Sequence, residues 1–308
     1  MNNEKVSILL SIYKPNKVFL KKQLRSLNSQ TYENLELIVW NDCPNERVDT
    51  DIFESEITNF PCKIYDEHVN LGYIKAFEKL VTLANGEYIC FCDQDDIWEN
   101  SKIEECISAL KAEDATVAVC DQSIIDENDT VTLESVRNSS KLSSKTWKTD
   151  DDITARALFI CYSPGMSMHA RKSDVERCIP FVDETAHDRQ LMAFLSAMGK
   201  AVFVEKPLIR YRRYGANETG TLNGVDSKKE YYLKRCNNTE LLRRFGELFP
   251  DRKDIDALKY CNEVRMSGNP FKLIKCKDMI PDLFKYEFLL AFCPDFVFKI
   301  LSKLLFKR

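Results

Sequence analysis

The first 120 residues alternate short apolar runs with longer amphipathic stretches, and this alternation limits the possible folds more than any other feature of the chain. The apolar runs are rich in branched and aromatic residues and predict buried strands at 6–11, 35–40, 62–65, 88–92 and 116–120. The stretches between them predict helices at 17–30, 73–83 and 101–111. Strands that alternate with helices are typical of a largely parallel sheet covered on both faces. The sequence therefore predicts an α/β fold with a mixed, mainly parallel sheet flanked by helices.

The composition is that of an ordinary globular protein. Of the 308 residues, 44% are hydrophobic and 30% are charged, which suffices for one large α/β domain and a helical extension. The net charge is only −4, so we expect no nucleic-acid partner.

The twelve cysteines favour reduced thiols over a disulfide framework. Several lie inside apolar, strand-like runs, where a thiol behaves as a small hydrophobic group: Cys90, Cys92, Cys120 and Cys161. No pair has the CxxC spacing of a zinc ribbon or a thioredoxin-type site. The amino-terminal residues lead directly into the first strand without an apolar signal segment. We therefore expect a cytoplasmic protein.

Carboxylates follow two of the predicted strands. Asp42 comes just after the second strand, and the acidic run 93–96 follows the strand at 88–92. Ligands of open α/β sheets bind beyond the carboxyl ends of the strands, so these carboxylates could face one crevice. Neighbouring carboxylates repel one another unless a cation lies among them, and Mg²⁺ or Mn²⁺ prefers such oxygen ligands. The pattern indicates a metal–diphosphate site; the alternative is an Asp-rich turn in which Asp96 begins the next helix.

Six segments in a fixed order give the pattern a more specific meaning. Together they resemble family 2 glycosyltransferases of the GT-A fold, and the form Asp-Gln-Asp-Asp-Ile-Trp resembles rhamnosyltransferase-like bacterial polysaccharide members. The resemblance covers residues 5–220. The segments are VSILLSIY (6–13), SLNSQTY (26–32), LELIVWND (35–42), NLG (70–72), ANGEYI (84–89) and DQDDIW (93–98).

The resemblance implies a site for a nucleotide-sugar donor. Its nucleobase and ribose pocket would be lined by Ser11, Tyr13 and Asp42, with Asn70 and Gly72 shaping the nearby wall. Asp95 would ligate Mn²⁺ or Mg²⁺, and Asp93 would lie against the ribose or a metal-bound water. Glycine would permit close backbone approach at residue 72. The alternatives are core packing for Tyr13 and an ordinary strand-end hydroxyl for Ser11.

A third acidic position supplies a candidate catalytic base. Sugar transfer with inversion needs a carboxylate to accept the proton of the attacking hydroxyl, and the resembling family places it in a Glu-Asp or His-Asp pair at a helix start. Asp188, in the segment 184–191, fits this pattern. The alternative is that Asp188 caps the predicted helix 188–198, while His187 orients the base or fills the helix start. Residues 163–168 resemble a glycine-containing strand beside the acceptor, or else form a turn before a buried strand.

The segment 208–220 resembles a closing motif of the family, with one departure. In that motif a histidine completes the metal shell, and basic residues, here Arg212 and Arg213, face the diphosphate. Tyr214 stands where the histidine is expected, and a phenol with a pKa near 10 is a poor ligand for a hard cation. We hypothesise that metal dependence is weaker than usual. The alternative for the two arginines is ordinary surface charge.

The remaining chain divides the molecule into a catalytic part and a helical extension. We expect a GT-A domain at 1–220, with a nucleotide-sugar-binding half at 1–125 and an acceptor half at 150–220 that includes a strand at 201–204, and helices at 221–308. The polar segment 126–152 is interpreted as a loop or lid.

The extension is charged differently from the rest. Residues 271–308 carry a net charge of +4, whereas the rest of the chain carries −8. Lys299, Lys303 and Lys307 recur every four residues, which favours an amphipathic helix lying on an anionic membrane surface at the inner face of the cell membrane. The alternative is a helix docked on its own domain or on a second copy in a homodimer.

The expected function is therefore that of an inverting, metal-dependent glycosyltransferase. It would move rhamnose or another hexose from a dTDP- or UDP-sugar to a growing cell-surface or capsular polysaccharide, and the resemblance implies a polyprenyl-linked acceptor. Two alternatives stay open. A sugar nucleotidyltransferase would normally have a Gly-rich loop where residues 13–16 read Tyr-Lys-Pro-Asn, and an inactive nucleotide-sugar-binding partner subunit would explain Tyr214.

Overall fold

A computed structural model describes residues 4–139, 147–214, 225 and 227–299. Over these residues the chain forms one nine-stranded sheet covered by helices on both faces. The strands are β1 (Val6–Ile12), β2 (Leu35–Asn41), β3 (Cys62–Tyr65), β4 (Tyr88–Cys92), β5 (Ile97–Trp98), β6 (Val117–Ile125), β7 (Val131–Leu133), β8 (Met168–Arg171) and β9 (Ala201–Arg212).

The sheet has a parallel half and a mixed half. Its strand order is β3-β2-β1-β4-β8-β6-β9-β5, with β7 paired to β6. The strands β3, β2, β1 and β4 are mutually parallel, whereas β8 runs antiparallel between β4 and β6. Beyond it, β9 is parallel to β6 and antiparallel to β5. The predicted fold class, a mixed and mainly parallel sheet flanked by helices, is confirmed.

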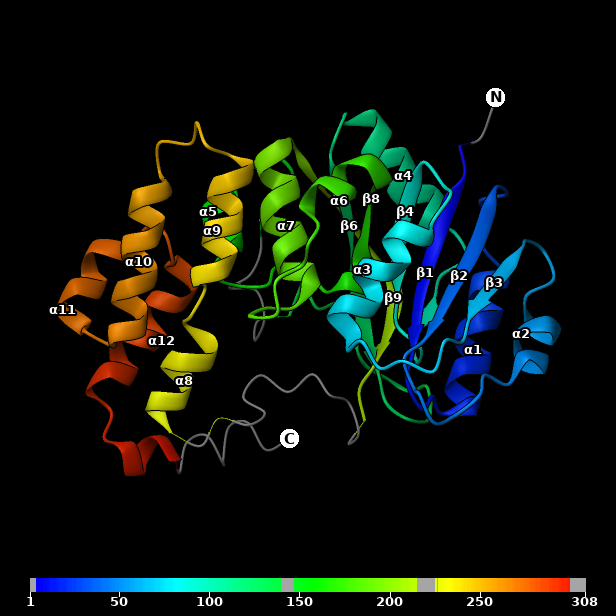
Figure 1. Cartoon of the computed structure of the whole chain (residues 1–308), viewed down its shortest axis with the longest axis horizontal. Helices are drawn as coiled ribbons and strands as arrows, with labels where there is room; N and C mark the ends of the chain where they lie inside the picture. Colours follow the sequence, from blue (N-terminus) through cyan, green and yellow to red (C-terminus); the bar gives the residue numbers. More distant parts are fainter. Residues whose placement is uncertain (1–3, 140–146, 215–224, 226, 300–308) are drawn as a thin grey trace.

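Alternate residues of the central strands pack against different helices. In β1, Ile8 and Leu10 face α1 (Lys17–Asn28), α2 (Thr50–Glu56) and α4 (Lys102–Ala112), whereas Leu9 faces the opposite layer. That layer consists of α3 (Tyr73–Leu83), α5 (Thr154–Ala157), α6 (Lys172–Cys178) and α7 (His187–Met198). Figure 1 shows α3, α6 and α7 lying across this face of the sheet.

Beyond β9 the described chain is helical. The elements are α8 (Lys228–Arg235), α9 (Thr239–Leu248), α10 (Ile255–Ser267), α11 (Pro270–Leu273) and α12 (Pro281–Phe292). They gather beside α7, at the opposite end of the molecule from β3 and α2 (Figure 1). Phe245 of α9 packs on Phe194 of α7 with ring centroids 5.4 Å apart, and the apolar core of the sheet continues into α9, α10 and α11. In the described ranges no helix is both long enough and apolar enough to cross a bilayer.

The structure corrects several expected boundaries. The strand expected at 201–204 continues to Arg212, because it pairs with the whole length of β6 and a register shift accommodates Pro207 opposite Asp121. The segment expected to be a loop or lid contains β7, and its residues 140–146 lie outside the described ranges. Helix α2 and the short strand β5 were not predicted.

The turn before β4 contains Asn85-Gly86, a pair that commonly closes a helix in the left-handed conformation. No positive φ occurs there. A Cβ atom on Gly86 would instead lie 2.7 Å from the backbone nitrogen of Ser7. Close packing between the turn and β1 therefore excludes a side chain at residue 86.

All twelve cysteines are free thiols. Cys90, Cys92 and Cys120 lie in strands as expected, but Cys161 lies in an irregular segment.

Candidate functional site

The acidic run 93–96 leaves the carboxyl end of β4 and turns back into β5. Asp96 does not begin a helix, since β5 follows it and α4 starts only at Lys102. Its side chain is completely buried; one carboxylate oxygen accepts the Arg212 amide at 2.9 Å, and the other has no hydrogen-bond partner among the described residues. Burial raises the pKa of Asp96 well above its ordinary value. Asp96 therefore anchors this turn to the end of β9.

Arg212, expected to face the diphosphate, is fully buried behind the acidic turn. Its Nε donates to the carbonyl of Asp95 at 2.8 Å, and its Nη1 donates to the carbonyl of Asp126 at 2.9 Å. The same nitrogen lies 2.6 Å from Oδ1 of Asp129, and the guanidinium carbon lies 4.3 Å from the ring centroid of Phe19. These contacts join the acidic turn to the β6–β7 hairpin.

Arg213, unlike the buried Arg212, lies at the surface. Its side chain is exposed, and its amide donates to the carbonyl of Ile125 at 2.8 Å. The guanidinium carbon lies 5.4 Å from the ring centroid of Tyr211. Of the two arginines expected at the diphosphate, only Arg213 presents its charge at the surface.

Tyr214 contacts Asp95, the expected metal ligand, directly. The phenol donates to Oδ2 of Asp95 at 2.8 Å, while its ring packs edge-on against Phe19 with centroids 5.2 Å apart. Burial raises the pKa of Tyr214, and the hydrogen bond to Asp95 adds to the increase, so the phenol stays protonated. The rest of the closing motif, residues 215–220, lies outside the described part of the chain.

Asp188 lies in the first turn of α7, whose N-cap is Ala186. Its Oδ1 accepts the amide of Arg189 at 2.6 Å, and the positive end of the helix dipole favours a carboxylate at this position. Asp188 is therefore not the N-cap residue. The segment expected as a glycine-containing strand is a 3₁₀ turn, Gly165–Ser167, that leads into β8, and a Cβ atom on Gly165 would lie 3.8 Å from the Cβ of Asp188.

His187 lies inside an aromatic enclosure beside Asp188. Its ring centroid is 4.4 Å from that of Phe77, 5.2 Å from that of Phe91 and 6.0 Å from that of Phe181. Neither ring nitrogen has a hydrogen-bond partner in the described residues, and burial lowers the pKa of His187 to about 4. The imidazole is therefore neutral near pH 7 and packs as an aromatic residue.

The start of α7 lies near the acidic turn although the two are distant in sequence. The ring of His187, which precedes Asp188, lies 5.2 Å from that of Phe91, two residues before Asp93. Burial, together with the nearby charges of Asp95 and Asp188, raises the pKa of Asp93 to about 7.

The pair of Asp93 and Asp95 fits a hard divalent cation. Both side chains offer carboxylate oxygens, the ligands that Mg²⁺ and Mn²⁺ prefer, and crowding of their charges is relieved by a cation. No group of three or more His, Cys, Asp or Glu side chains in the described residues is arranged to hold a metal. A Mg²⁺-type site commonly uses only one or two carboxylates and is completed by water and phosphate, which matches this arrangement.

Asp42, expected to line the nucleotide pocket, lies just beyond β2. Asp42 is 4% exposed, and its Oδ1 accepts the amide of Leu71 at 2.7 Å and Nε1 of Trp40 at 3.2 Å. The side chain of Asn70 accepts the amide of Gly72 at 2.9 Å. Gly72 has φ +74°, and nothing lies within 4 Å of a Cβ atom added there, so glycine is needed for this backbone conformation and not for close approach.

Tyr13 is fastened to the acidic turn by Gln94. The side chain of Gln94 accepts the Tyr13 amide at 2.9 Å and donates to the Tyr13 carbonyl at 3.2 Å. The ring of Tyr13 is 42% exposed, so it is not a core residue. Ser11 is half-buried and pairs in register with Trp40, on the sheet face covered by α3.

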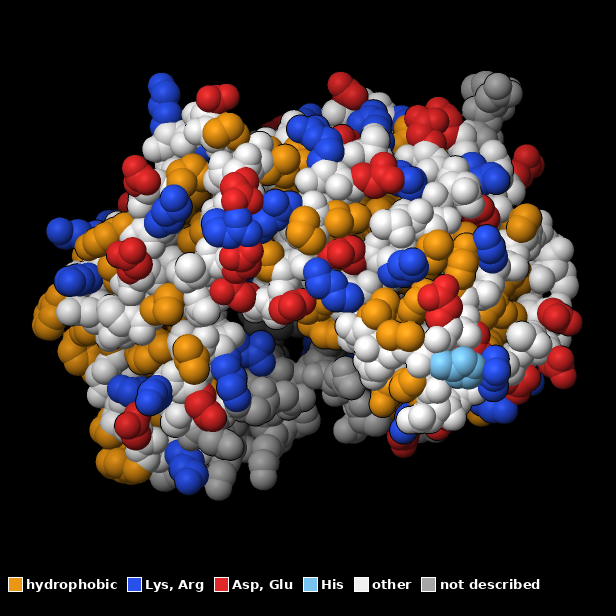
Figure 2. Space-filling model, viewed as in Figure 1, with side chains coloured by type: hydrophobic (Ala, Val, Ile, Leu, Met, Phe, Trp, Pro, Cys, Tyr) orange, Lys and Arg blue, Asp and Glu red, His pale blue; other side chains and the backbone are white. Residues whose placement is uncertain are grey.

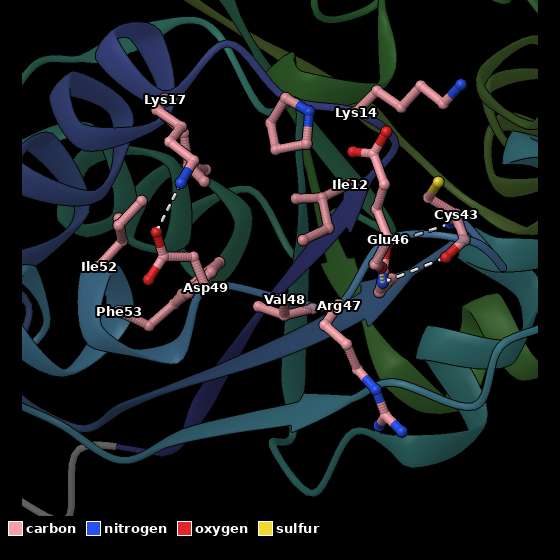
Figure 3. Close-up of a pocket in the computed structure, with 13 residues that line it drawn as sticks. Ile12, Lys14, Lys17, Cys43, Glu46, Arg47, Val48, Asp49, Ile52 and Phe53 are labelled. Atoms are coloured by element: carbon pink, nitrogen blue, oxygen red, sulfur yellow. Dashed lines mark hydrogen bonds and ion pairs between the residues drawn. The ribbon is translucent and has the colours of Figure 1, made fainter.

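A cavity of about 310 Å³ opens on the other face of the same strand ends. Ile12 and Asn41, which pair in register, contribute to it together with residues of α1, α2 and the connection after β2. Figure 3 shows Lys17 and Asp49 joined at one side of the cavity and Lys14 and Glu46 at the other. None of the predicted site residues lines this cavity. Ser11, which comes just before Ile12, points to the opposite face because successive side chains alternate along a strand.

Two residues that contribute to the site were missed from the sequence. Gln94 has no distinguishing signal outside its motif. Lys102 is fully buried beneath the turn, with Nζ 3.1 Å from the ring centroid of Trp98 and 3.4 Å from Nε2 of His169, and its charge opposes the increase in the pKa of Asp93. The only sequence feature that could have indicated the position of Lys102 is its spacing of four residues from Trp98.

The loop and helix that carry Asp188 are also bonded to the C-terminal helices. The carboxylate of Glu184 accepts the amides of Glu240 and Leu241 at 2.9 and 3.3 Å, in the first turn of α9. Arg189 donates to the carbonyl of Leu158 at 2.9 Å and to the side chain of Asn238. The first turn of α7 and the start of α9 therefore form one bonded unit.

Comparisons with known proteins agree with this architecture. Residues 7–176 match the model of glycosyl transferase family 2. An uncharacterized glycosyltransferase of Haemophilus influenzae is 26% identical over 250 residues, covering 78% of this chain and 75% of the relative, and one of Nostoc sp. is 23% identical over 73% of this chain and 70% of the relative.

Solved structures share the fold at low sequence identity. Residues 1–349 of S. aureus TarS in complex with UDP-GlcNAc superpose with a TM-score of 0.60 at 13% identity, covering 94% of this chain and 89% of that chain. The mannosyltransferase PcManGT of Pyrobaculum calidifontis in complex with GDP-Man and Mn²⁺ gives a TM-score of 0.56 at 15% identity, covering 94% and 81%.

Proposed function

The chain belongs to glycosyl transferase family 2, and from this membership we propose that it transfers rhamnose or another hexose, with inversion, from a dTDP- or UDP-sugar to a saccharide acceptor. Its curated relatives are glycosyltransferases, and the two solved structures compared above hold a UDP-sugar or a GDP-sugar. Family membership and these similarities support glycosyl transfer from a nucleotide-sugar donor. The choice of rhamnose rests on the form Asp-Gln-Asp-Asp-Ile-Trp at 93–98.

One observation carries the proposal: the ring of His187, next to Asp188, lies 5.2 Å from that of Phe91 in β4, so the start of α7 lies beside the strand that leads into the acidic turn. Asp93 and Asp95 would hold Mn²⁺ or Mg²⁺, which when bound neutralises charge on the departing diphosphate. Asp188 would accept the proton of the acceptor hydroxyl as its oxygen bonds to the anomeric carbon. The bond from that carbon to the diphosphate oxygen breaks on the opposite side, so the configuration inverts.

The other expected donor residues would bind and orient the nucleotide. The exposed ring of Tyr13 offers a stacking surface, and Asp42 holds the 70–72 segment through the amide of Leu71. Arg213 would contribute positive charge to the diphosphate, since its side chain is exposed beside the acidic turn. Arg212 would act indirectly, by fixing that turn.

The acceptor would be a growing cell-surface or capsular polysaccharide on a polyprenyl carrier. Such an acceptor would place the enzyme in the cytoplasm at the inner face of the membrane, with residues 271–308 as the region nearest the lipid. A homodimer is the competing use of that region.

A donor panel tests the function. The purified chain is incubated with dTDP-rhamnose, dTDP-glucose, UDP-glucose and UDP-GlcNAc, each with Mn²⁺, with Mg²⁺ or with a chelator, and nucleotide release is measured. Release from a dTDP- or UDP-sugar that rises with a saccharide acceptor supports the proposal. Binding of nucleotide by calorimetry without release from any donor would indicate an inactive partner subunit, and formation of a nucleotide-sugar from a sugar phosphate would indicate a nucleotidyltransferase.

A further inference from the structure

The C-terminal helices expose a group of large apolar side chains, here called the aromatic patch. Its members are Phe271 (72% exposed), Ile274 (46%), Leu289 (69%), Phe292 (57%) and Phe296 (69%). The rings of Phe271 and Phe292 lie 6.3 Å apart between centroids, so α11 and α12 share the patch. Isolated exposed apolar residues are normal, but a contiguous set is costly in water unless something covers it.

The side of α12 that faces away from the aromatic patch is packed against α10 and α8, and this packing keeps the patch exposed. Glu287 of α12 is 2% exposed and pairs with Arg265 of α10 at 2.6 Å. Its carboxylate also accepts the hydroxyl of Tyr231 at 3.2 Å, and Leu290 is buried on the same side of the helix. A rotation of α12 that buried Phe292 would break this buried ion pair, which makes it unfavourable. The exposure of the patch is therefore a consequence of the packing.

Positive charge predominates among the exposed side chains of the segment that carries the aromatic patch, where five lysines outnumber the exposed carboxylates Asp278 and Asp295. The exposed basic side chains of α11, of α12 and of the segments next to them are Lys272, Lys275, Lys277, Lys285 and Lys299. Of the four acidic residues in 271–299, Glu287 is buried in its ion pair and Asp282 bonds the hydroxyl of Tyr162. Figure 2 shows hydrophobic side chains together with Lys and Arg side chains along the edge of the molecule over α11.

We propose that the aromatic patch and these lysines form a docking surface for an anionic lipid bilayer. Aromatic residues partition into the interfacial region of a bilayer, while nearby lysines are attracted to anionic headgroups. A second copy of the chain fits the patch less well, because a two-fold contact places the same lysines against one another. Lys303 and Lys307, which belong to the predicted amphipathic helix, lie outside the described residues.

The proposal names the surface by which the protein would reach the membrane location proposed above, and it rests on the proposed function in one respect only. If the acceptor is carried on a lipid, a docked C-terminal layer would hold the helical end of the molecule on the bilayer, with α9 and α10 between the patch and α7 (Figure 1). The binding itself does not depend on the identity of the donor or acceptor. Vesicle binding is therefore measured without either, and sugar transfer is measured without vesicles, so that the two proposals can fail separately.

The test is flotation of the full chain with vesicles of phosphatidylcholine alone or of phosphatidylcholine with phosphatidylglycerol. A patch variant carries Phe271→Ser, Leu289→Ser and Phe292→Ser. Its matched control carries Leu233→Ser and Tyr260→Ser, which are 59% and 40% exposed on α8 and α10. A charge variant, Lys272→Glu with Lys275→Glu, is paired with Lys253→Glu with Lys259→Glu, two lysines exposed away from the patch.

We expect the wild-type chain and both controls to float with the anionic vesicles and to stay in solution with phosphatidylcholine alone. The patch variant should bind at least about tenfold more weakly, and the charge variant about fivefold more weakly for each lysine replaced. Equal binding by the patch variant and its control would overturn the proposal, as would a wild-type chain that ignores anionic vesicles. A dimer seen by light scattering that the patch variant converts to a monomer, without vesicle binding, would assign the surface to a second copy.

Discussion

The hydroxyl of Tyr214 donates a hydrogen bond to the carboxylate of Asp95 at 2.8 Å. The sequence pattern places a histidine at this position in the resembling family, and here a phenol occupies it and contacts the expected metal ligand. A phenol with a raised pKa donates a proton rather than a lone pair, so Tyr214 orients Asp95 without joining the metal shell.

Replacing this phenol by an imidazole should therefore strengthen metal binding. Tyr214→His offers a neutral nitrogen ligand beside Asp95, and we expect the Mn²⁺ affinity, measured by calorimetry in the presence of UDP, to rise about tenfold. Tyr214→Phe is the control, since it removes the hydrogen bond and supplies no ligand. Equal Mn²⁺ affinities for the His and Phe variants would contradict this role.

The same contact leads to a prediction for the wild-type chain. With no ligand from residue 214, metal dependence should be weaker than in a chain with histidine there, so nucleotide release should persist in part when the metal is chelated. Complete loss of activity with chelator, restored by Mn²⁺, would show that the carboxylates alone make the enzyme fully metal-dependent.

Asp188→Asn should separate binding from transfer. An amide keeps the size of the side chain but cannot accept the hydroxyl proton, so the transfer rate should fall at least about a hundredfold, with nucleotide affinity unchanged in calorimetry. Asp183→Asn is the matched control, because Asp183 is exposed in the loop before α7. Turnover retained by Asp188→Asn would place the base at another residue.

The adjacent arginines should respond differently to the same substitution. Arg212→Met leaves Asp129 and two carbonyl groups without their buried cation, so the free energy of unfolding should fall by about 3 kcal/mol. Arg213→Met should leave the urea unfolding midpoint almost unchanged and should raise KM for the donor. If both variants unfold at the wild-type urea concentration, the buried contacts of Arg212 are not stabilising.

Gly165 lies so close to α7 that a methyl group should disturb Asp188. A Cβ atom there would be 2.8 Å from Nε2 of His187, so Gly165→Ala must displace this ring, which is packed among aromatic residues at the start of α7, and should lower the transfer rate. Gly246→Ala is the control, since its nearest atom would be 3.7 Å away, an ordinary contact. Similar rates for the two variants would mean that the turn yields without moving Asp188.

Burial of His187 should make the fold sensitive to acid. The folded chain binds a proton at His187 only near pH 4, whereas an unfolded chain binds it near pH 6.5. The neutral ring therefore stabilises the fold above pH 6.5, and this contribution of about 3 kcal/mol is lost as the pH falls from 6.5 to 4. In urea unfolding, His187→Phe should lose less stability over that interval than the wild type, whereas His68→Phe, at an exposed position, should keep the wild-type slope. Parallel slopes for all three proteins would exclude His187 as the source.

The sequence predicts the parallel half of the sheet well because its signals are local. Each strand from β1 to β4 is a short apolar run, and the helices α1 and α3 begin and end close to the expected residues, whereas the short helix α2 was missed. The position of Asp95 follows from the same pattern, since strand ends are visible in the sequence. Asp188 was chosen because the segment 184–191 resembles the acidic pair that the family places at a helix start, and its catalytic role stays a prediction.

The mixed half depends on pairing between distant segments, which local patterns do not reveal. Strand β8 has only four residues and is stabilised by β4 and β6 on its two sides. Pro207 argues against a long β9, yet the register shift opposite Asp121 accommodates it. Arg212 and Arg213 look equivalent in the sequence; only the register of β9 against β6 decides which of them is buried.

The contacts of Glu184 and Arg189 with α9 carry a consequence for how this enzyme could be shortened. A chain ending near residue 225 would keep every strand of the sheet and every residue of the acidic turn. It would nevertheless remove the outer support of the helix that carries Asp188, so the loss would appear as slow transfer with intact nucleotide binding. The secondary structure changes from sheet to helices at this boundary, but we expect that a chain cut there would no longer be fully active.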